Sequence, residues 1–262
     1  MPDPTGISTD MSRRRFLTAV TAASMGTLGA VGFDRVVASG EKTSGIPDPD
    51  AHLTALSAKD ATRALADLAL EAKVRRFVHI STVSVHGEEL PSRVDEDSPL
   101  ATADPEPYCS SKALGELALG QVRAKGLETV VLRPGMICNV VRSQWGNEMV
   151  ERIRTRGWPK AMHPDDVLPW VQTQNLAEMA RLALTHPAAA GETFLAVDRN
   201  VALRDFFVPI ANALGQPVLV PDRPPQISEC RVGKLATKLG YKPVRSFDET
   251  MVGLLALAKA PH

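Results

Sequence analysis

The sequence has few cysteines, few aromatic residues and no excess of either charge. Among its 262 residues are three cysteines, and aromatic residues make up 5% of the chain. Three cysteines cannot build a disulfide framework. The thirty basic and thirty acidic residues cancel, which gives no support to nucleic-acid binding or to a polybasic membrane contact. The length and the hydrophobic content of 44% allow one domain or one and a half.

Clusters of cysteine and histidine with metal-ligand spacing are also lacking, so the sequence predicts no metal site. We expect Cys109, Cys138 and Cys230 to be small buried apolar residues. The six histidines are scattered, and His79 lies within an apolar run. We expect it to be a satisfied interior residue rather than a ligand.

Residues 1–40 resemble an export leader. The motif SRRRFLT at residues 12–18 matches the twin-arginine pattern. The uncharged stretch at 16–33 is only modestly apolar, whereas a membrane span needs about 20 strongly apolar residues. We therefore expect a twin-arginine signal, cleaved after Ala38 or near Gly40, no stable membrane span, and export to the periplasm. If the arginine triplet is fortuitous, the protein is cytoplasmic.

Part of this leader has a competing interpretation. Gly26, Gly29 and Gly32 have the GxxGxxG spacing that lets a backbone approach a dinucleotide pyrophosphate at a helix start. No second strand ending in a ribose-binding acidic or basic residue follows them. Residues 39–47 have the composition of a loop instead. We interpret the glycine spacing as coincidental.

The rest of the chain alternates between helical and strand patterns. This alternation predicts an α/β fold, a Rossmann-like parallel sheet with helices on its faces. The predicted helices span residues 51–72, 108–124, 144–156, 176–185, 203–214, 231–239 and 248–259. The predicted strands span residues 34–38, 77–82, 128–133, 167–171 and 193–197.

The most informative stretch is Tyr108-Cys109-Ser110-Ser111-Lys112. It places a phenol and an ammonium one helical turn apart, so both project from the same helix face. A free phenol has a pKa of about 10, and a neighbouring lysine cation is expected to lower it. Thr82, at a strand end upstream, could hold a substrate oxygen in line. Such groups can move a proton on and off a carbonyl or alcohol oxygen, which suits hydride transfer with a nicotinamide.

The motifs around this stretch resemble the extended short-chain dehydrogenase/reductase family, the NAD-dependent epimerase/dehydratase group. The resemblance runs from about Asp34 to Leu255. The matching segments are residues 76–82, 85–87, 94–99, 105–108, 132–137, 171–177 and 238–243.

The resemblance implies roles for six residues. Tyr108 would be the general acid/base, Lys112 would lower the pKa of Tyr108 and hydrogen-bond the nicotinamide ribose, and Thr82 would orient the substrate oxygen. The turn formed by Pro134, Gly135 and Met136 would shape the nicotinamide pocket. The implied cofactor is NAD or NADP.

The resemblance also implies a chain shortened at its N-terminal end. The family builds the adenosine half of its cofactor site from a first strand, a glycine-rich turn and two more strand–helix units, for which no sequence is present here. We therefore expect residues 41–262 to form a partial NAD(P)-binding domain, with a small substrate region at about 140–262. The missing first strand would lie beside the strand at 34–38, so we expect an exposed edge, a homodimer that covers it, or poor stability.

The implied activity is oxidation, reduction or epimerisation at a secondary alcohol or ketone of a small molecule, such as a sugar nucleotide or a sterol-like substrate. Val83 and Ser84 stand where an acidic pair would indicate a sugar-nucleotide 4,6-dehydratase, so dehydration is disfavoured. His86 replaces the family's usual tyrosine, which bears on local substrate contacts. The alternatives are a catalytically inactive relic or binding protein of the same fold, and a leader joined to an enzyme's tail.

Overall fold

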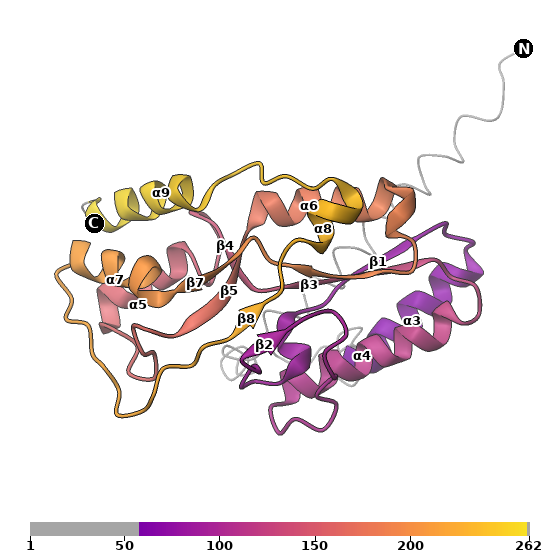
Figure 1. Cartoon of the computed structure of the whole chain (residues 1–262), viewed down its shortest axis with the longest axis horizontal. Coiled ribbons are helices and arrows are strands. Elements are labelled where there is room, and N and C mark those ends of the chain that lie inside the picture. Colours follow the sequence, from indigo (N-terminus) through magenta and orange to yellow (C-terminus); the bar gives the residue numbers. More distant parts are fainter. Residues whose placement is uncertain (1–57, 261–262) are drawn as a thin grey trace, which may run out of the picture.

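The computed structural model describes residues 58–260, in which helices and strands alternate (Figure 1). The α-helices are α3 (Ala58–Glu71), α4 (Pro107–Arg123), α5 (Asn147–Arg156), α6 (Thr173–Thr185), α7 (Leu203–Ala213), α8 (Lys234–Leu239) and α9 (Phe247–Lys259). The strands are β1 (Phe77–Ile80), β2 (Arg93–Val94), β3 (Thr129–Pro134), β4 (Met136–Cys138), β5 (Val167–Gln172), β6 (Thr193–Ala196), β7 (Arg199–Ala202) and β8 (Glu229–Cys230). Two short 3-10 helices are η2 (Val83–His86) and η3 (Pro187–Ala189).

Three strands form the parallel sheet that carries the Rossmann-like fold. Their order is β1-β3-β6, with Phe77 beside Thr129 and Val131 beside Thr193. The predicted α/β fold with a parallel sheet is therefore confirmed. On the described part of the chain β1 pairs only with β3. The strand predicted at residues 34–38 lies outside the described residues.

The strands outside this sheet were predicted less well. They form a pair, β2-β8, and a second sheet of order β4-β5-β7, in which β7 runs antiparallel to β5. β7 was not predicted as a strand, and it leaves the β1-β3-β6 sheet to pair with β5. The helix predicted from residue 231 begins only at Lys234, because Gly233 has a φ of 120°, outside the helical range.

The two faces of the β1-β3-β6 sheet are covered by different helices. Phe77 and Val131 face one side, where they pack with leucines of α3 and α4. Val130, Leu132 and Phe194 face the other side, where α6 and α8 cover them. Figure 1 shows α3 and α4 below this sheet and α6 and α8 above it. Successive side chains of a strand point to opposite faces of the sheet, so each strand contributes to both clusters.

A second hydrophobic cluster surrounds Trp170, at the left of Figure 1. The rings of Phe206 and Phe247 lie edge-on to Trp170, and α5, α7 and α9 pack together with the β4-β5-β7 sheet. Elements after residue 140 contribute to both clusters, since α6, β6 and α8 belong to the Rossmann-like core. The substrate region at 140–262 stays a prediction.

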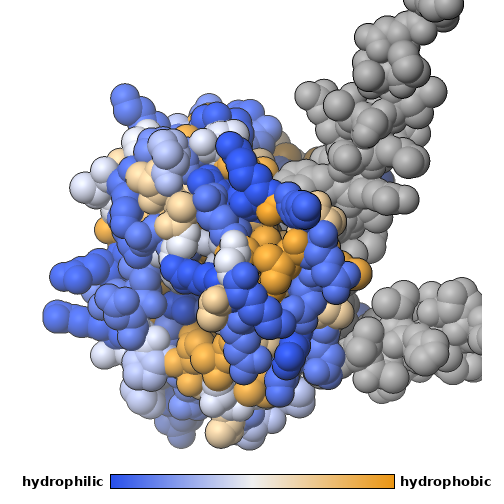
Figure 2. Space-filling model, turned by 90° about the vertical axis from the view of Figure 1, so that its right-hand side faces the viewer, coloured by the Kyte–Doolittle hydropathy of each residue, from blue (hydrophilic) through white to orange (hydrophobic). Residues whose placement is uncertain are grey.

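Few of the described features test the predicted location and assembly of the protein. Among residues 58–260, no helix combines the length and apolarity required to traverse a bilayer. The end of the molecule near α3 is mostly hydrophilic and has small hydrophobic patches (Figure 2). The twin-arginine motif, the glycine spacing at 26–32 and the cleavage positions lie outside the described residues. The signal and the homodimer stay predictions.

The three cysteines are buried with free thiols, as predicted. Burial raises the pKa of Cys109 to about 11 and that of Cys138 and Cys230 to about 12. Such thiols stay protonated at neutral pH and behave as small apolar side chains.

Candidate functional site

The end of β1 places Thr82 at the start of a tight turn. Thr82 has extended backbone angles and caps η2, since its hydroxyl oxygen accepts a hydrogen bond from the Ser84 amide at 3.2 Å. The strand ends here because the amide of a following residue is satisfied by a side chain rather than by the sheet. Thr82 is 7% exposed. Its hydroxyl is therefore fixed at the carboxyl end of the parallel sheet, where α/β proteins bind ligands.

Tyr108 lies in the first turn of α4. Pro107 occupies the first helical position, where its fixed φ and missing amide hydrogen are tolerated. The Glu106 carboxylate caps the helix by accepting a hydrogen bond from the Tyr108 amide at 3.2 Å. These local signals set the helix start one residue before the predicted position and leave the phenol half-buried against the end of β1.

The structure brings the three predicted catalytic residues together. The phenol of Tyr108 lies beside the hydroxyl of Thr82, close enough for that hydroxyl to lower its pKa. The Lys112 ammonium, one turn further along α4, donates to the Ile80 carbonyl oxygen at 3.2 Å, two residues before Thr82. Lys112 is buried, with 7% of its surface exposed. A phenol, a hydroxyl and an ammonium thus share one end of the sheet.

The pKa of the phenol differs from the predicted direction. Burial raises the pKa of Tyr108 above its usual value of 10, and the neighbouring Thr82 hydroxyl offsets only part of this rise. Burial likewise lowers the pKa of Lys112, while Glu116 favours its charged form. Burial therefore sets the direction of the shift, and the effect of Lys112 on the phenol stays a prediction. The phenol is protonated at neutral pH and is a proton donor.

The predicted pocket residues Pro134, Gly135 and Met136 join two sheets. Pro134 ends β3 and Met136 begins β4, with Gly135 between them. A Cβ at Gly135 would lie 2.4 Å from the carbonyl oxygen of Pro169, so only glycine fits there. The structure thus gives Gly135 a packing role. The contact of this turn with a nicotinamide stays a prediction.

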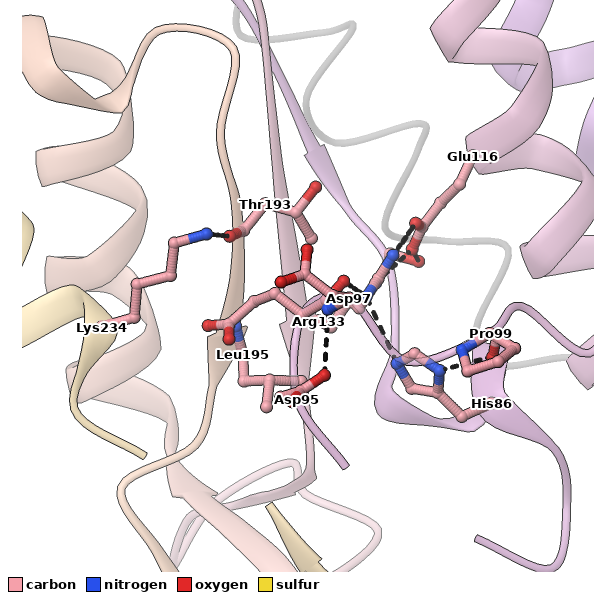
Figure 3. A network of polar contacts seen from close by, with 11 residues as sticks. His86, Asp95, Asp97, Pro99, Glu116, Arg133, Thr193, Leu195 and Lys234 are labelled. Carbon is pink, nitrogen blue, oxygen red and sulfur yellow. Dashed lines mark hydrogen bonds and ion pairs between the residues drawn. The ribbon is translucent and has the colours of Figure 1, made fainter. Parts of the chain in front are cut away.

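A buried polar network lies beside these residues and was not predicted. Glu116 of α4 and Arg133 of β3 form an ion pair of 2.7 Å with both side chains buried. Ser81 donates to Glu116. Arg133 also contacts His86 (Figure 3). One signal in the sequence could have found it: Glu116 follows Lys112 by four residues and so shares its helix face.

His79 is buried but not satisfied. It is 2% exposed, and neither ring nitrogen has a hydrogen-bond partner in the described structure. Burial, reinforced by Lys112, lowers its pKa to about 4, although Glu116 acts in the opposite direction. The expectation of a satisfied interior histidine is correct for its burial and wrong for its hydrogen bonds. Among residues 58–260 no group of side chains could hold a metal ion.

A large part of the chain matches a known protein family. A family model described as "NAD dependent epimerase/dehydratase family" matches residues 28–196. Among curated proteins, the chain is 27% identical over 148 residues to a 4-hydroxy-2-methyl-3-oxo-4-farnesyl-3,4-dihydroquinoline-1-oxide ketoreductase of Stigmatella aurantiaca, covering 56% of this chain and 44% of the relative. It is 42% identical over 73 residues to a dTDP-glucose 4,6-dehydratase of Streptomyces niveus, covering 28% of this chain and 21% of the relative. The matched part thus spans less than half the length of these relatives.

Solved structures share the fold. A short-chain dehydrogenase/reductase superfamily protein from Agrobacterium tumefaciens with bound NAD has a TM-score of 0.64 at 24% identity, covering 84% of this chain and 77% of that one. A dTDP-glucose 4,6-dehydratase from Streptomyces venezuelae has the same TM-score and identity, covering 82% and 71%. At this identity the likeness supports the Rossmann-like arrangement of the chain and nothing finer.

Proposed function

The chain belongs to the NAD dependent epimerase/dehydratase family, and on this premise we propose that it is an NAD-dependent oxidoreductase or epimerase acting on a secondary alcohol or ketone. One observation carries the proposal: the phenol of Tyr108 lies beside the Thr82 hydroxyl, at the end of β1 where the Lys112 ammonium is also held. These groups stand at the carboxyl end of the parallel sheet, the end at which α/β proteins bind ligands.

The donor set at this end of the sheet fits the nicotinamide half of the cofactor. An ammonium has three donors, and within the described structure Lys112 uses one of them on the Ile80 carbonyl. Its other hydrogens suit the hydroxyls of a ribose. Gly26, Gly29 and Gly32, the residues with a spacing suited to the adenosine half, lie outside the described residues. The choice between NAD and NADP depends on that half.

The chain's own residues supply the proton chemistry. The neutral phenol of Tyr108 donates its proton to a substrate carbonyl oxygen in the direction of reduction. The Thr82 hydroxyl holds the same oxygen in line, and Lys112 orients the ribose and favours the phenolate after the proton has left. When bound, the nicotinamide supplies or takes the hydride at the substrate carbon.

We propose a substrate with a ketone or secondary alcohol on a ring, such as a sugar nucleotide or a polycyclic, sterol-like compound. The curated relatives support both classes, since one is a ketoreductase of a quinoline oxide and the other a sugar-nucleotide dehydratase. Residues 140–262 would select among them. Val83 and Ser84 offer no carboxylate after Thr82, which favours reduction or epimerisation over dehydration.

The test of this proposal compares the chain's two tyrosines. Tyr108→Phe removes the phenolic oxygen at the site, and we expect turnover to fall by about 10²–10⁴-fold. Tyr241→Phe is the matched control, because Tyr241 donates to Asp198 at 2.6 Å in a structural network. We expect it to retain turnover. Nicotinamide absorbance on a panel of ring ketones measures both variants, and equal rates for Tyr108→Phe and the wild type would refute the proposal.

We also propose that the protein is exported by the twin-arginine route. The motif SRRRFLT at residues 12–18 supports this proposal. Replacing Arg13 and Arg14 by lysine should retain a reporter, fused after Gly40, in the cytoplasm. Unchanged reporter location in cell fractions would rule out the signal.

A further inference from the structure

A buried ion pair lies next to the proposed catalytic residues and takes no part in the proton transfer itself. Arg133 Nη2 lies 2.7 Å from Glu116 Oε2, and the two side chains are 6% and 5% exposed. Arg133 Nε also donates to both carboxylate oxygens, at 3.1 and 3.2 Å. Such a two-pronged contact fixes the relative orientation of its partners. It therefore joins α4 rigidly to β3.

The first link from this pair reaches the residue before Thr82. The Ser81 hydroxyl donates to Glu116 Oε1. Glu116 lies about two turns after Tyr108 on α4. The bond between Ser81 and Glu116 therefore sets how closely the start of α4 approaches the end of β1, which is the approach that brings Tyr108 to Thr82.

The second link reaches the far end of η2, which Thr82 caps. His86 is the last residue of η2, and its Nε2 lies 3.3 Å from Arg133 Nη1. Its Nδ1 lies 2.9 Å from the Pro99 carbonyl, which can only accept, so Nδ1 carries the hydrogen and Nε2 accepts from the guanidinium. The turn that holds Thr82 is thus anchored on both sides, and both anchors end on the same ion pair.

The pair is itself held by the sheet. Arg133 Nη1 donates to the Glu96 carbonyl at 2.9 Å, and the Glu96 side chain accepts from the Leu195 amide on β6 at 3.1 Å. Figure 3 shows Arg133 between Glu116 and His86, with Leu195 on the other side of the network. Glu116 and Arg133 therefore have a fixed position relative to β3 and β6, from which they can position the turn.

We propose that Glu116 and Arg133 are positioning residues, which hold the Thr82 hydroxyl beside the Tyr108 phenol. A buried ion pair is poor evidence for stability, since apolar side chains of similar volume often stabilise a fold equally well. A role in geometry accounts for its contacts on both sides of Thr82. The catalytic meaning of this geometry rests on the proposed function, whereas its test does not use turnover.

The test measures the phenol directly by nuclear magnetic resonance. Tyrosine labelled at Cζ with carbon-13 gives two signals, because the chain has two tyrosines. Tyr241→Phe assigns them. Thr82→Val removes the hydroxyl that lies beside Tyr108 and defines the position of the Tyr108 signal without that contact.

The test variant is the double substitution Glu116→Met and Arg133→Met, which replaces the ion pair by unbranched apolar side chains. We expect the Tyr108 signal to move most of the way to its position in Thr82→Val, with the Tyr241 signal unchanged. Ser81→Ala, which removes a single buried hydroxyl and leaves the ion pair, should move the Tyr108 signal in the same direction by a smaller amount. Arg76→Met is the control, because it breaks the Arg76–Glu128 pair at the other end of β1 and should leave the Tyr108 signal in place.

A folded double variant with the wild-type Tyr108 signal would overturn the positioning role. If the double variant does not fold, an unmoved signal in Ser81→Ala overturns it instead. Shifted signals in a protein whose wild type turns over no ketone would refute the proposed function and retain the positioning role.

Discussion

At the scale of single residues, burial determines the chemistry of the ionisable groups near β1. Burial raises the pKa of Tyr108 and lowers the pKa values of Lys112, His79 and His86. In each case burial favours the neutral form over the charged form, because a charged group loses hydration in the interior. The phenol is thus a proton donor first, and it becomes a base only when further positive charge arrives at the site.

His79 should make the fold sensitive to mild acid. Its pKa is about 4 in the native protein, and the ordinary value of 6.5 applies when it is unfolded. Above pH 6.5 both states are neutral, so the full stability is present. Between pH 6.5 and 4 the unfolded state binds more protons, and about 3 kcal/mol of unfolding free energy is lost. Urea titrations at pH 7 and pH 4.5 should show this loss in the wild type.

The variant His79→Leu tests the assignment. It removes two buried nitrogens that have no hydrogen-bond partner in the described structure, so it should be as stable as the wild type or more so at pH 7. The difference between wild type and variant should then grow as the pH falls. A wild type and a variant that lose equal stability from pH 7 to 4.5 would show that His79 does not titrate in this way.

At the scale of elements, two glycines should differ in how their replacement by alanine changes stability. Gly135 joins β3 to β4, where a Cβ would lie 2.4 Å from the Pro169 carbonyl oxygen, whereas a Cβ at Gly120 in α4 would meet nothing within 4 Å. Gly135→Ala should lower the unfolding free energy by about 1–3 kcal/mol, because backbone must move. Gly120→Ala should raise it by about 0.5–1 kcal/mol, because alanine favours the helix. Denaturant midpoints of the pair measure both, and changes of the same sign would contradict the packing described for Gly135.

The elements that the sequence predicts are those with a strong local signal. The strand at Phe77 and the helix at Tyr108 are predicted within a few residues, because one is a mostly apolar run and the other carries the Tyr108–Lys112 motif in its first turns. Short β7 was not predicted, since four residues carry too little pattern and its pairing with β5 depends on distant chain. The start of α8 was misplaced by three residues, because it is set by the backbone conformation of Gly233, which the apolar pattern does not report.

The candidate site divides in the same way. The sequence predicts that Thr82, Tyr108 and Lys112 meet, because the motif fixes two of them on one helix face and the third at a strand end. The direction of the phenol's pKa depends on its burial, which no local pattern reports. The Glu116–Arg133 pair depends on how α4 approaches β3, so it emerges only from the folded chain.

At the scale of the whole molecule, the described residues form one Rossmann-like sheet with two helical layers and a second, aromatic cluster beside it. A buried network joins the C-terminal segment to the core. Asn175 accepts from the amides of Val244 and Arg245 at 2.9 Å, and its amide nitrogen donates to Asp198 at 2.7 Å. The segment at 244–245, which precedes α9, is thereby fixed against α6 and against Asp198, which follows β6.

The central claim is that this sheet end binds a nicotinamide cofactor through Lys112. Titration of the purified full chain with NADH, followed by nicotinamide fluorescence, tests it most directly. We predict saturable binding to the wild type and weaker binding, by about tenfold or more, to Lys112→Met, with Arg76→Met unchanged. This loss corresponds to about 1.4 kcal/mol or more. Equal binding by Lys112→Met and wild type, or a wild type without saturable binding at millimolar NADH and NADPH, would contradict the account.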